Sequence, residues 1–138
     1  MAFRETDIHT LKFNPFDKIS KQWMLITAGD RTKSNTMTAS WGGVGIMWGK
    51  PVATAYIRPQ RYTKEFVDQN EYFTLSFLSE EYRKALNVCG SVSGRDVEDK
   101  WQEAGLHPCY VAEGTPEETA AVEEAEMIFV CRKLYAQE

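Results

Sequence analysis

The sequence predicts a mainly β protein with short helices, in the α+β class, built as one domain over residues 1–138. Two observations favour this class. The strand-like stretches lie well apart along the chain, and they do not alternate regularly with helices, as they would in a parallel α/β sheet. The size agrees, because 138 residues with 43% apolar content suffice for one buried core. We expect the strands to pair mostly antiparallel.

Four stretches have the composition of strands. Residues 22–27 form an apolar run that ends at a turn-forming Ala-Gly-Asp. Residues 52–57 alternate β-branched with small side chains before Pro59 ends regular pairing. Residues 72–77 alternate polar and apolar side chains, and residues 127–135 form a β-branched and aromatic run. These are the strands that we expect, in chain order.

Three short helices fit between these strands. Thr63 is positioned to cap a helix over 63–70. Ser79 is positioned to cap a second helix, whose apolar side chains recur at the i, i+3, i+4, i+7 spacing of a buried face. Asp96 is positioned to cap a third helix that ends at Gly105.

The acidic stretch 112–126 admits two interpretations, a helical turn or a crossover loop, and we predict a loop that leads into the last strand. The chain contains only two histidines, His9 and His107, and we expect the carboxylates of the acidic stretch to have no histidine partner. No metal-ligand cluster and no Ser-His-Asp or Cys-His site is therefore indicated. We expect His107 on a surface loop. We also expect one charge run to be a solvated loop: Glu117, Glu118, Glu123 and Glu124.

The charge and the cysteines restrict partners and location. A net charge of -4 argues against nucleic acid or an anionic membrane as the main partner, since both attract basic surfaces. No segment approaches the roughly eighteen apolar residues of a membrane span, and the charged stretch 2–7 is unlike an export signal. Cys89, Cys109 and Cys131 are odd in number and widely spaced, so they indicate no disulfide framework. We expect a cytoplasmic protein.

Two segments combine the groups that a planar ligand with an anionic tail requires. Residues 35–43 read Asn-Thr-Met-Thr-Ala-Ser-Trp-Gly-Gly, and residues 58–63 read Arg-Pro-Gln-Arg-Tyr-Thr. Together they supply small hydroxyl residues, glycines that expose the backbone, an aromatic plate and two arginines. Flavin mononucleotide, FMN, is a ligand of this kind.

Six segments, in order along the chain, resemble the flavin reductase-like family that includes flavoredoxin. They are 35–43, Lys50-Pro51, 58–63, 72–77, the Cys-Gly-Ser-x-Ser-Gly-Arg-Asp of 89–96 and the Cys-Arg-Lys-Leu-Tyr of 131–135. The resemblance implies an FMN-binding split β-barrel, usually a homodimer with flavin sites at or near the subunit interface. Chains of this family usually continue past that last segment, so we expect that the usual C-terminal extension is lacking here and that a strand edge is exposed.

The resemblance implies a cofactor site built from three groups of residues. A phosphate favours a helix N-terminus with guanidinium groups, and the chain offers Arg58, Arg61, Tyr62 and Thr63 there. The edge of the flavin ring is expected at a loop formed by Asn35, Met37, Thr38, Ala39, Ser40 and Trp41. A wall beside the flavin is expected from Cys89, Gly90, Ser91, Ser93 and Arg95.

Structural interpretations of the same residues stay open. Thr63 can be a simple helix cap with the two arginines as surface charges, and Trp41 can be an ordinary core aromatic. Cys89 lies on an apolar helix stripe, so we interpret it as a small buried side chain and not as a redox thiol.

Two functions of different class follow from the resemblance. The first is an NAD(P)H-dependent flavin reductase that passes electrons from NADH or NADPH through FMN to an acceptor. The nicotinamide cofactor would dock transiently, because no Gly-x-Gly-x-x-Gly motif follows a strand. The second is a flavoredoxin-like electron carrier served by a protein partner, and a non-flavin interaction module is a third possibility. We assign no catalytic residue, because the flavin itself performs the redox chemistry.

Overall fold

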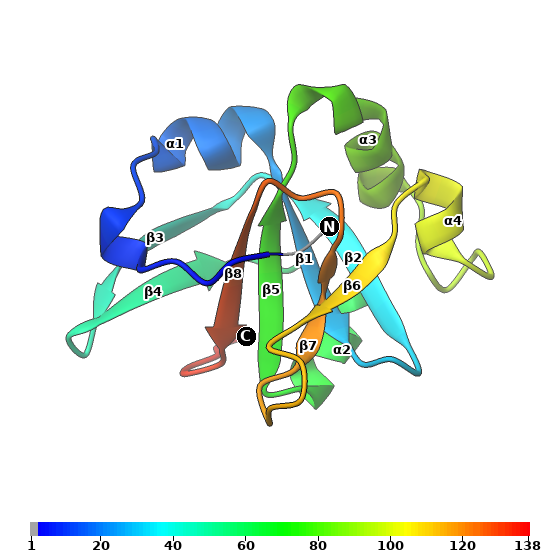
Figure 1. Cartoon of the computed structure of the whole chain (residues 1–138). Coiled ribbons are helices and arrows are strands. Elements are labelled where there is room, and N and C mark those ends of the chain that lie inside the picture. The colour runs from blue at the N-terminus through cyan, green and yellow to red at the C-terminus, as the bar shows by residue number, and fades with distance from the viewer. Residues whose placement is uncertain (1–2) are drawn as a thin grey trace.

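A computed structural model describes residues 3–138, so Met1 and Ala2, where the charged N-terminal stretch begins, lie outside the described residues. The centre of the fold is an antiparallel sheet with the strand order β2-β1-β5-β8. Two further antiparallel ribbons, β3–β4 and β6–β7, flank this sheet (Figure 1). The mainly β class with short helices and antiparallel pairing is therefore confirmed.

The helices are short and lie before the first strand or between strands along the chain. They are η1 (Ile8–Thr10), α1 (Pro15–Asp17), the π-helical η2 (Lys18–Gln22), β1 (Met24–Gly29), β2 (Ser34–Ala39), β3 (Gly42–Met47), β4 (Lys50–Ala55), α2 (Thr63–Gln69), β5 (Tyr72–Phe77), η3 (Glu80–Tyr82), α3 (Arg83–Ser91), α4 (Lys100–Ala104), β6 (Pro108–Val111), β7 (Thr119–Val122) and β8 (Met127–Arg132). The four predicted strands correspond to β1, β4, β5 and β8, with β5 placed as predicted and the others shifted or shortened at their ends.

The central sheet is covered on both faces. On one face, α2 contributes Phe66 and Val67 to a core shared with Ile26 and Leu75. On the other face, α3, α4 and the β6–β7 ribbon enclose a second core, which includes Leu25, Leu86, Trp101, Leu106 and Val122. Strand β1 is buried along its whole length, as expected for a strand between two covered faces. Each fully buried large apolar side chain stabilises the fold by roughly 1.5–3 kcal/mol.

The predicted loop at 35–39 is wrong, because these residues form β2. Strand β2 pairs with β1 along its length, from Met24 opposite Ala39 to Gly29 opposite Ser34. The turn between the two strands is closed by Asp30, whose Oδ1 accepts hydrogen bonds from the amides of residues 32 and 33 at 2.9 and 3.0 Å. Gly29 adopts a positive φ of 127°, which favours glycine at this turn.

The predicted loop over 112–126 is also wrong, because β7 lies inside it. Strand β7 is fully buried, and side chains of β5 bond to its backbone. The Thr74 hydroxyl donates to the Ala120 carbonyl at 2.8 Å, and the Val122 amide donates to Ser76 Oγ at 3.4 Å. The small side chains of β7 let the ribbon lie close enough to the sheet for these bonds to form.

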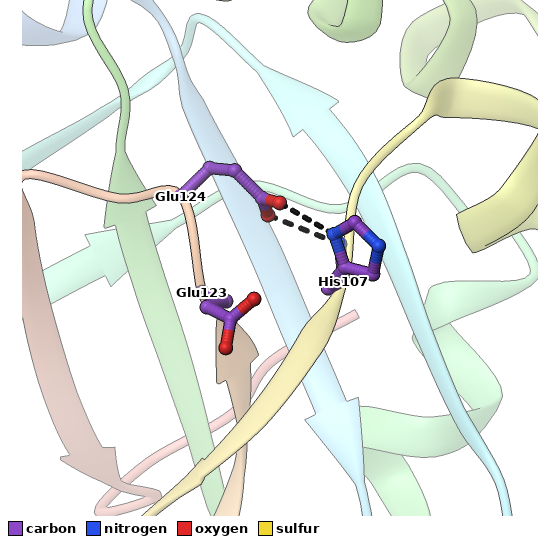
Figure 2. Close-up of side chains that lie close together, drawn as sticks. All are labelled: His107, Glu123 and Glu124. Carbon is purple, nitrogen blue, oxygen red and sulfur yellow. Dashed lines mark hydrogen bonds and ion pairs between the residues drawn. The ribbon is translucent and has the colours of Figure 1, made fainter. Parts of the chain in front are cut away.

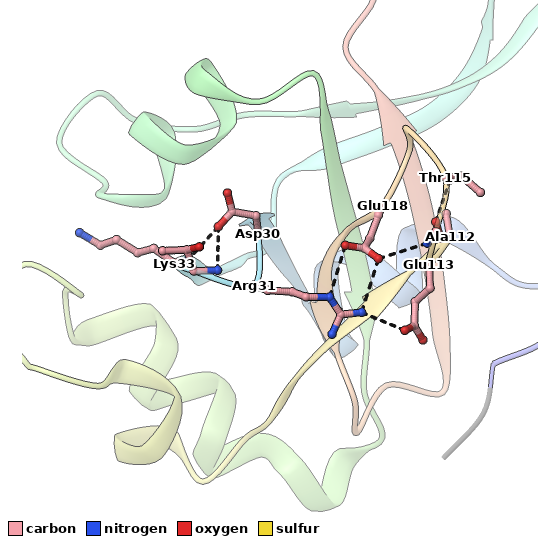
Figure 3. A network of polar contacts seen from close by, with 9 residues as sticks. Asp30, Arg31, Lys33, Ala112, Glu113, Thr115 and Glu118 are labelled. Atoms are coloured by element: carbon pink, nitrogen blue, oxygen red, sulfur yellow. Dashed lines mark hydrogen bonds and ion pairs between the residues drawn. The ribbon is translucent and has the colours of Figure 1, made fainter.

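The carboxylates of this region are not simply solvated. Figure 3 shows Arg31, from the turn between β1 and β2, reaching Glu113 and Glu118 between β6 and β7. The ion-pair distances are 2.9 Å to Glu113 and 3.4 Å to Glu118, and the guanidinium also lies 4.6 Å from the centre of the Tyr110 ring. The network joins one end of the sheet to the ribbon that covers it.

The helix caps differ from the predicted ones. Thr63 is the first residue of α2, and its hydroxyl accepts a bond from the interior instead of capping the helix. Ser79 precedes the single turn η3 and makes no side-chain cap bond. Asp99, not Asp96, caps α4 by accepting from the Gln102 amide at 3.2 Å. Gly105 ends α4 in the left-handed conformation, as predicted.

The β3–β4 ribbon extends away from the central sheet on the side opposite α3 and α4 (Figure 1). It carries exposed apolar side chains, among them Val44, Ile46 and Trp48. No helix within residues 3–138 combines the length and the hydropathy that a bilayer crossing would need.

Candidate functional site

A cleft of about 200 Å³ lies where the chain enters α2, beside the end of α3. Three segments far apart in sequence meet in it: the turn before α2, the residues that end α3, and the first residue of α4. The lining residues are Arg58, Gln60, Arg61, Tyr62, Thr63, Gly90, Ser91, Val92, Ser93 and Lys100. The fold thus brings together both arginines and both serines that the sequence suggested, although they come from separate segments.

The two arginines give the cleft a positive wall. The guanidinium of Arg61 is half-buried and donates from Nη2 to the Cys89 carbonyl at 3.2 Å, which fixes it against α3. Burial lowers the pKa of Arg61, and the neighbouring charge of Arg58 lowers it further. An anion in the cleft would offset both the burial of the Arg61 charge and its repulsion by Arg58, since the anion would pair with the guanidinium groups.

Lys100 is the functional candidate that the sequence prediction missed. Only 5% of its surface is exposed, yet it lines the cleft. Burial is the main reason that its pKa falls from 10.5 to about 8, and the charge of Arg61 lowers it too, while Cys89 acts in the opposite direction. Within residues 3–138 the ammonium group has no hydrogen bond or ion pair, and no carboxylate lines the cleft. A buried cation of this kind fits a bound anion.

The structure gives Lys100 one further unusual feature. It is the first residue of α4, directly after the cap residue Asp99. A cation is unfavourable beside the positive end of a helix dipole, so a lysine at this position is unusual. A single helix turn gives only a weak signal, and nothing in the sequence indicates that α4 would pack beside α3 and β2.

The predicted ring-binding residues divide into buried and exposed groups. Asn35, Met37 and Ala39 are buried within the chain, and the Asn35 amide donates to the Thr63 hydroxyl at 2.7 Å. Thr38 donates its hydroxyl to the Leu86 carbonyl at 2.5 Å, so it joins β2 to α3. Ser40 and Trp41 are exposed. The residues that were expected to form one loop therefore divide into a largely buried strand, residues 35–39, and an exposed pair, Ser40 and Trp41.

Trp41 is not a core aromatic, because 65% of its surface is exposed. It stands between β2 and β3, at the base of the ribbon. Its indole ring is available for contact with a ligand or with another chain, and the core interpretation of this residue is wrong.

Cys89 is completely buried on the inner face of α3, in agreement with its interpretation as a small apolar side chain. Burial raises the pKa of its thiol to about 11, so the thiol is protonated near neutral pH. Cys89 does not line the cleft, and it contacts the site only through its backbone carbonyl, which accepts the bond from Arg61. Gly90 follows it, and a Cβ there would lie 3.4 Å from Thr38 Cβ, which shows how closely β2 and α3 pack.

Arg95 does not line the cleft. Its guanidinium forms an ion pair with Glu65 in the first turn of α2 and donates to the Gln60 carbonyl at 3.0 Å. It also lies 4.9 Å from the centre of the Tyr62 ring. Arg95 was predicted to bind an anionic group of the ligand, but its guanidinium is already paired with the carboxylate of Glu65.

Figure 2 shows a second polar cluster at the start of β6, formed by residues that do not line the cleft. His107 Nδ1 lies 2.6 Å from one carboxylate oxygen of Glu124, and the His107 amide donates to the other oxygen at 3.0 Å. One ligand atom each from His107, Glu123 and Glu124 lie within 4.8 Å of one another. The expectation that these carboxylates lack a histidine partner is wrong, because the β6–β7 pairing brings residues 107 and 123 together.

The comparisons with known proteins agree with the fold. The model of the flavin reductase like domain family matches residues 16–137. An FMN-binding domain of a flavin reductase-like enzyme from Shewanella baltica OS155 superposes with a TM-score of 0.73 at 17% identity, over 88% of this chain and 62% of that chain. Flavoredoxin of Desulfovibrio vulgaris (Miyazaki F) gives 0.72 at 23% identity, over 98% of this chain and 69% of that chain.

Flavoredoxin from Methanosarcina acetivorans superposes similarly, with a TM-score of 0.72 at 20% identity, over 99% of this chain and 67% of that chain. The chain therefore spans between 62 and 69% of the length of these three structures. A comparison with curated proteins gives no match. Because the family model covers nearly the whole sequence, the protein belongs to the flavin reductase like domain family, and its fold is the split barrel of that family's FMN-binding members.

Proposed function

We propose that this protein binds FMN and holds the phosphate of the cofactor in the cleft between α2 and α3. The observation that carries the proposal is Lys100, a buried cation that has no anionic partner within the described residues. Arg58 and Arg61 share the cleft with it, and a phosphate with about two negative charges would neutralise this cluster. Ser93 adds a hydroxyl donor at the opposite wall, because its Oγ accepts from the Arg95 amide and keeps its own proton available. The Ser91 hydroxyl, which also lines the cleft, already donates to the Asn87 carbonyl at 2.8 Å.

The family suggests what the bound cofactor would contribute. FMN would supply the redox chemistry, accepting and releasing electrons at its ring. The residues described here bind and orient its phosphate, and Arg61 is held in place for that task by the Cys89 carbonyl. The exposed Trp41 is the candidate of this chain for contact with the ring.

For the reaction, we propose an NAD(P)H-dependent flavin reductase that passes electrons from NADH or NADPH through FMN to an acceptor. The family suggests oxidoreductase chemistry of this kind. The likeness to two flavoredoxins favours a second candidate, an FMN electron carrier that receives its electrons from a protein partner. Anaerobic addition of NADH or NADPH to the FMN-loaded protein separates the two, because the reductase bleaches the flavin absorbance without added protein and the carrier does not.

We also propose a homodimer that forms through the β3–β4 ribbon. Val44, Ile46, Trp48 and the nearby Trp41 and Tyr56 are large apolar side chains exposed on this projecting element. Contiguous apolar surface of this kind is unfavourable in water and typical of protein interfaces. All three cysteines are free thiols, which suits the reducing cytoplasm that we propose as its location.

The first experiment is a visible absorption titration of the purified protein with FMN. Saturable binding with a changed flavin spectrum would support the proposal, while an unchanged FMN spectrum would contradict it. Arg61→Ala should weaken FMN binding by about 1.5–3 kcal/mol and leave riboflavin binding unchanged, because riboflavin lacks the phosphate. Lys100→Met should also weaken FMN binding, because it removes a cation from the cleft. Lys84→Met is its matched control, since Lys84 is exposed on α3 and does not line the cleft.

A further inference from the structure

The segment between α3 and α4 is fixed to the start of α2 by one side chain. Arg95 pairs with Glu65 of α2 and donates to the Gln60 carbonyl at 3.0 Å, so it reaches both the first turn of the helix and the turn before it. Its own amide donates to Ser93 Oγ at 3.2 Å. The guanidinium thus joins two elements that the sequence separates by 30 residues.

Close backbone packing supports the same junction. A Cβ at Gly94 would lie 2.4 Å from Asn35 Oδ1 and 2.9 Å from Tyr62 Cδ2, and both distances are too short for a Cβ contact unless the neighbouring atoms move. The backbone at residue 94 therefore rests directly on β2 and on the residue before α2. Arg95 stacks over the same Tyr62 ring at 4.9 Å, which places the ion pair beside this contact.

The junction lies beside the cleft and connects its two walls. One wall carries Arg58 and Arg61 on the turn that leads into α2. The other carries Ser91, Ser93 and Lys100, which lie at the two ends of the segment that Arg95 fixes. Arg95 therefore bridges the turn that carries one wall and the segment that connects the residues of the other.

We propose that Arg95 and Glu65 are a positioning pair, which holds segment 91–99 against the start of α2 and so keeps Ser93 and Lys100 within reach of one phosphate. The inference rests on the proposed binding of FMN. It assigns Arg95 no direct contact with the cofactor, because Glu65 and the Gln60 carbonyl occupy its guanidinium and it does not line the cleft. Glu65 acts here through Arg95, although a carboxylate near an anion site would by itself repel the anion.

The sign of the effect at Glu65 distinguishes positioning from direct binding. If the pair positions the wall, Glu65→Gln and Arg95→Gln should each speed FMN dissociation by about three- to tenfold, and the double variant should be no worse than either single one. Riboflavin affinity should stay within about twofold of wild type, because the pair affects the phosphate end. If Arg95 binds phosphate directly, Glu65→Gln should leave FMN affinity unchanged or increase it, and that result would overturn the proposal.

Two controls complete the test. Asp68→Asn removes a carboxylate from the same helix, where Asp68 pairs with Lys64 at 2.7 Å outside the cleft, and it should leave FMN dissociation unchanged. Amide hydrogen exchange without FMN tests the junction alone: both positioning variants should speed exchange over residues 91–99, and unchanged exchange would overturn the proposal. A wild-type protein that binds no FMN would instead overturn the proposed function, and the exchange result would still show whether the pair holds the segment.

Discussion

The side-chain amide of Asn35 donates a 2.7 Å hydrogen bond to the hydroxyl of Thr63, and both residues are buried. This bond joins β2 to the first residue of α2, directly behind the turn that carries Arg58 and Arg61. The position of the cationic turn therefore depends on a polar contact in the interior.

Replacing Thr63 with valine should destabilise the protein by about 1–3 kcal/mol, because the Asn35 amide would lose its acceptor in a buried place. Urea denaturation of wild type and variant measures this difference. Thr10→Val is the matched control, since the Thr10 hydroxyl is exposed, and it should change stability much less. Equal effects of the two substitutions would contradict the importance of the interior bond.

Gly94→Ala should lower both stability and FMN affinity, because the new methyl group would collide with Asn35 Oδ1 at 2.4 Å. Overpacking of this kind costs about 1–3 kcal/mol and would lift the segment from β2. Thermal unfolding and FMN titration measure the two effects. Gly45→Ala is the control, because a Cβ at Gly45 has no heavy atom within 4 Å, and a control as damaging as Gly94→Ala would refute the collision.

Lys100→Met should stabilise the FMN-free protein by roughly 1–3 kcal/mol near pH 7, because it removes a buried charge. The pKa of Lys100 is lowered from 10.5 to about 8, so the unfolded chain holds this proton between these pH values while the folded chain releases it. The unfolding free energy of wild type should therefore rise with pH across this window. The gain of the variant should be largest below about pH 8 and shrink toward pH 10.5, and a gain independent of pH would contradict the assignment.

The hydrogen bond to Glu124 raises the pKa of His107, and the nearby charges of Glu124 and Glu123 act in the same direction. Glu124→Gln should therefore lower the pKa of His107, which an NMR titration of the imidazole signals would show. In wild type the favourable contact is complete below the ordinary pKa of 6.5 and is lost as the pH rises through the higher folded pKa. An unchanged titration curve in the variant would rule out Glu124 as the cause.

The parts of the fold that the sequence predicted well are those in which local pattern and burial agree. Alternating residues at 72–77 form β5, and Gly105 ends α4 where a left-handed residue is required. Strand β2 escaped prediction because its threonines and asparagine look like loop residues. They are acceptable inside the fold because Thr36 and Thr27 share a 2.9 Å hydroxyl bond across the sheet. Thr36 meets Thr27 only because β2 pairs with β1, and the composition of the segment does not reveal this strand pairing.

The candidate site shows the same division. The motif residues Arg58, Arg61, Ser91 and Ser93 come together in the cleft. The sequence could predict this, because the types and order of these residues indicate an anionic ligand. Lys100 could not be recognised as the third cation, because its burial depends on how α4 packs. The ion pair of Arg95 with Glu65 likewise depends on tertiary contact, so a sequence reading could only treat the arginine as available to a ligand.

The close approach of β7 to β5 limits how this sequence can vary. Ala120 and Ala121 have no exposed surface, and the Ala120 carbonyl is already bonded to Thr74. A larger side chain at either position would wedge the ribbon away from the sheet and leave buried polar groups without partners. The alanine side chains of β7 thus set the spacing between the two layers, and enlarging either one should destabilise the folded monomer more than a substitution on the exposed β3–β4 ribbon would.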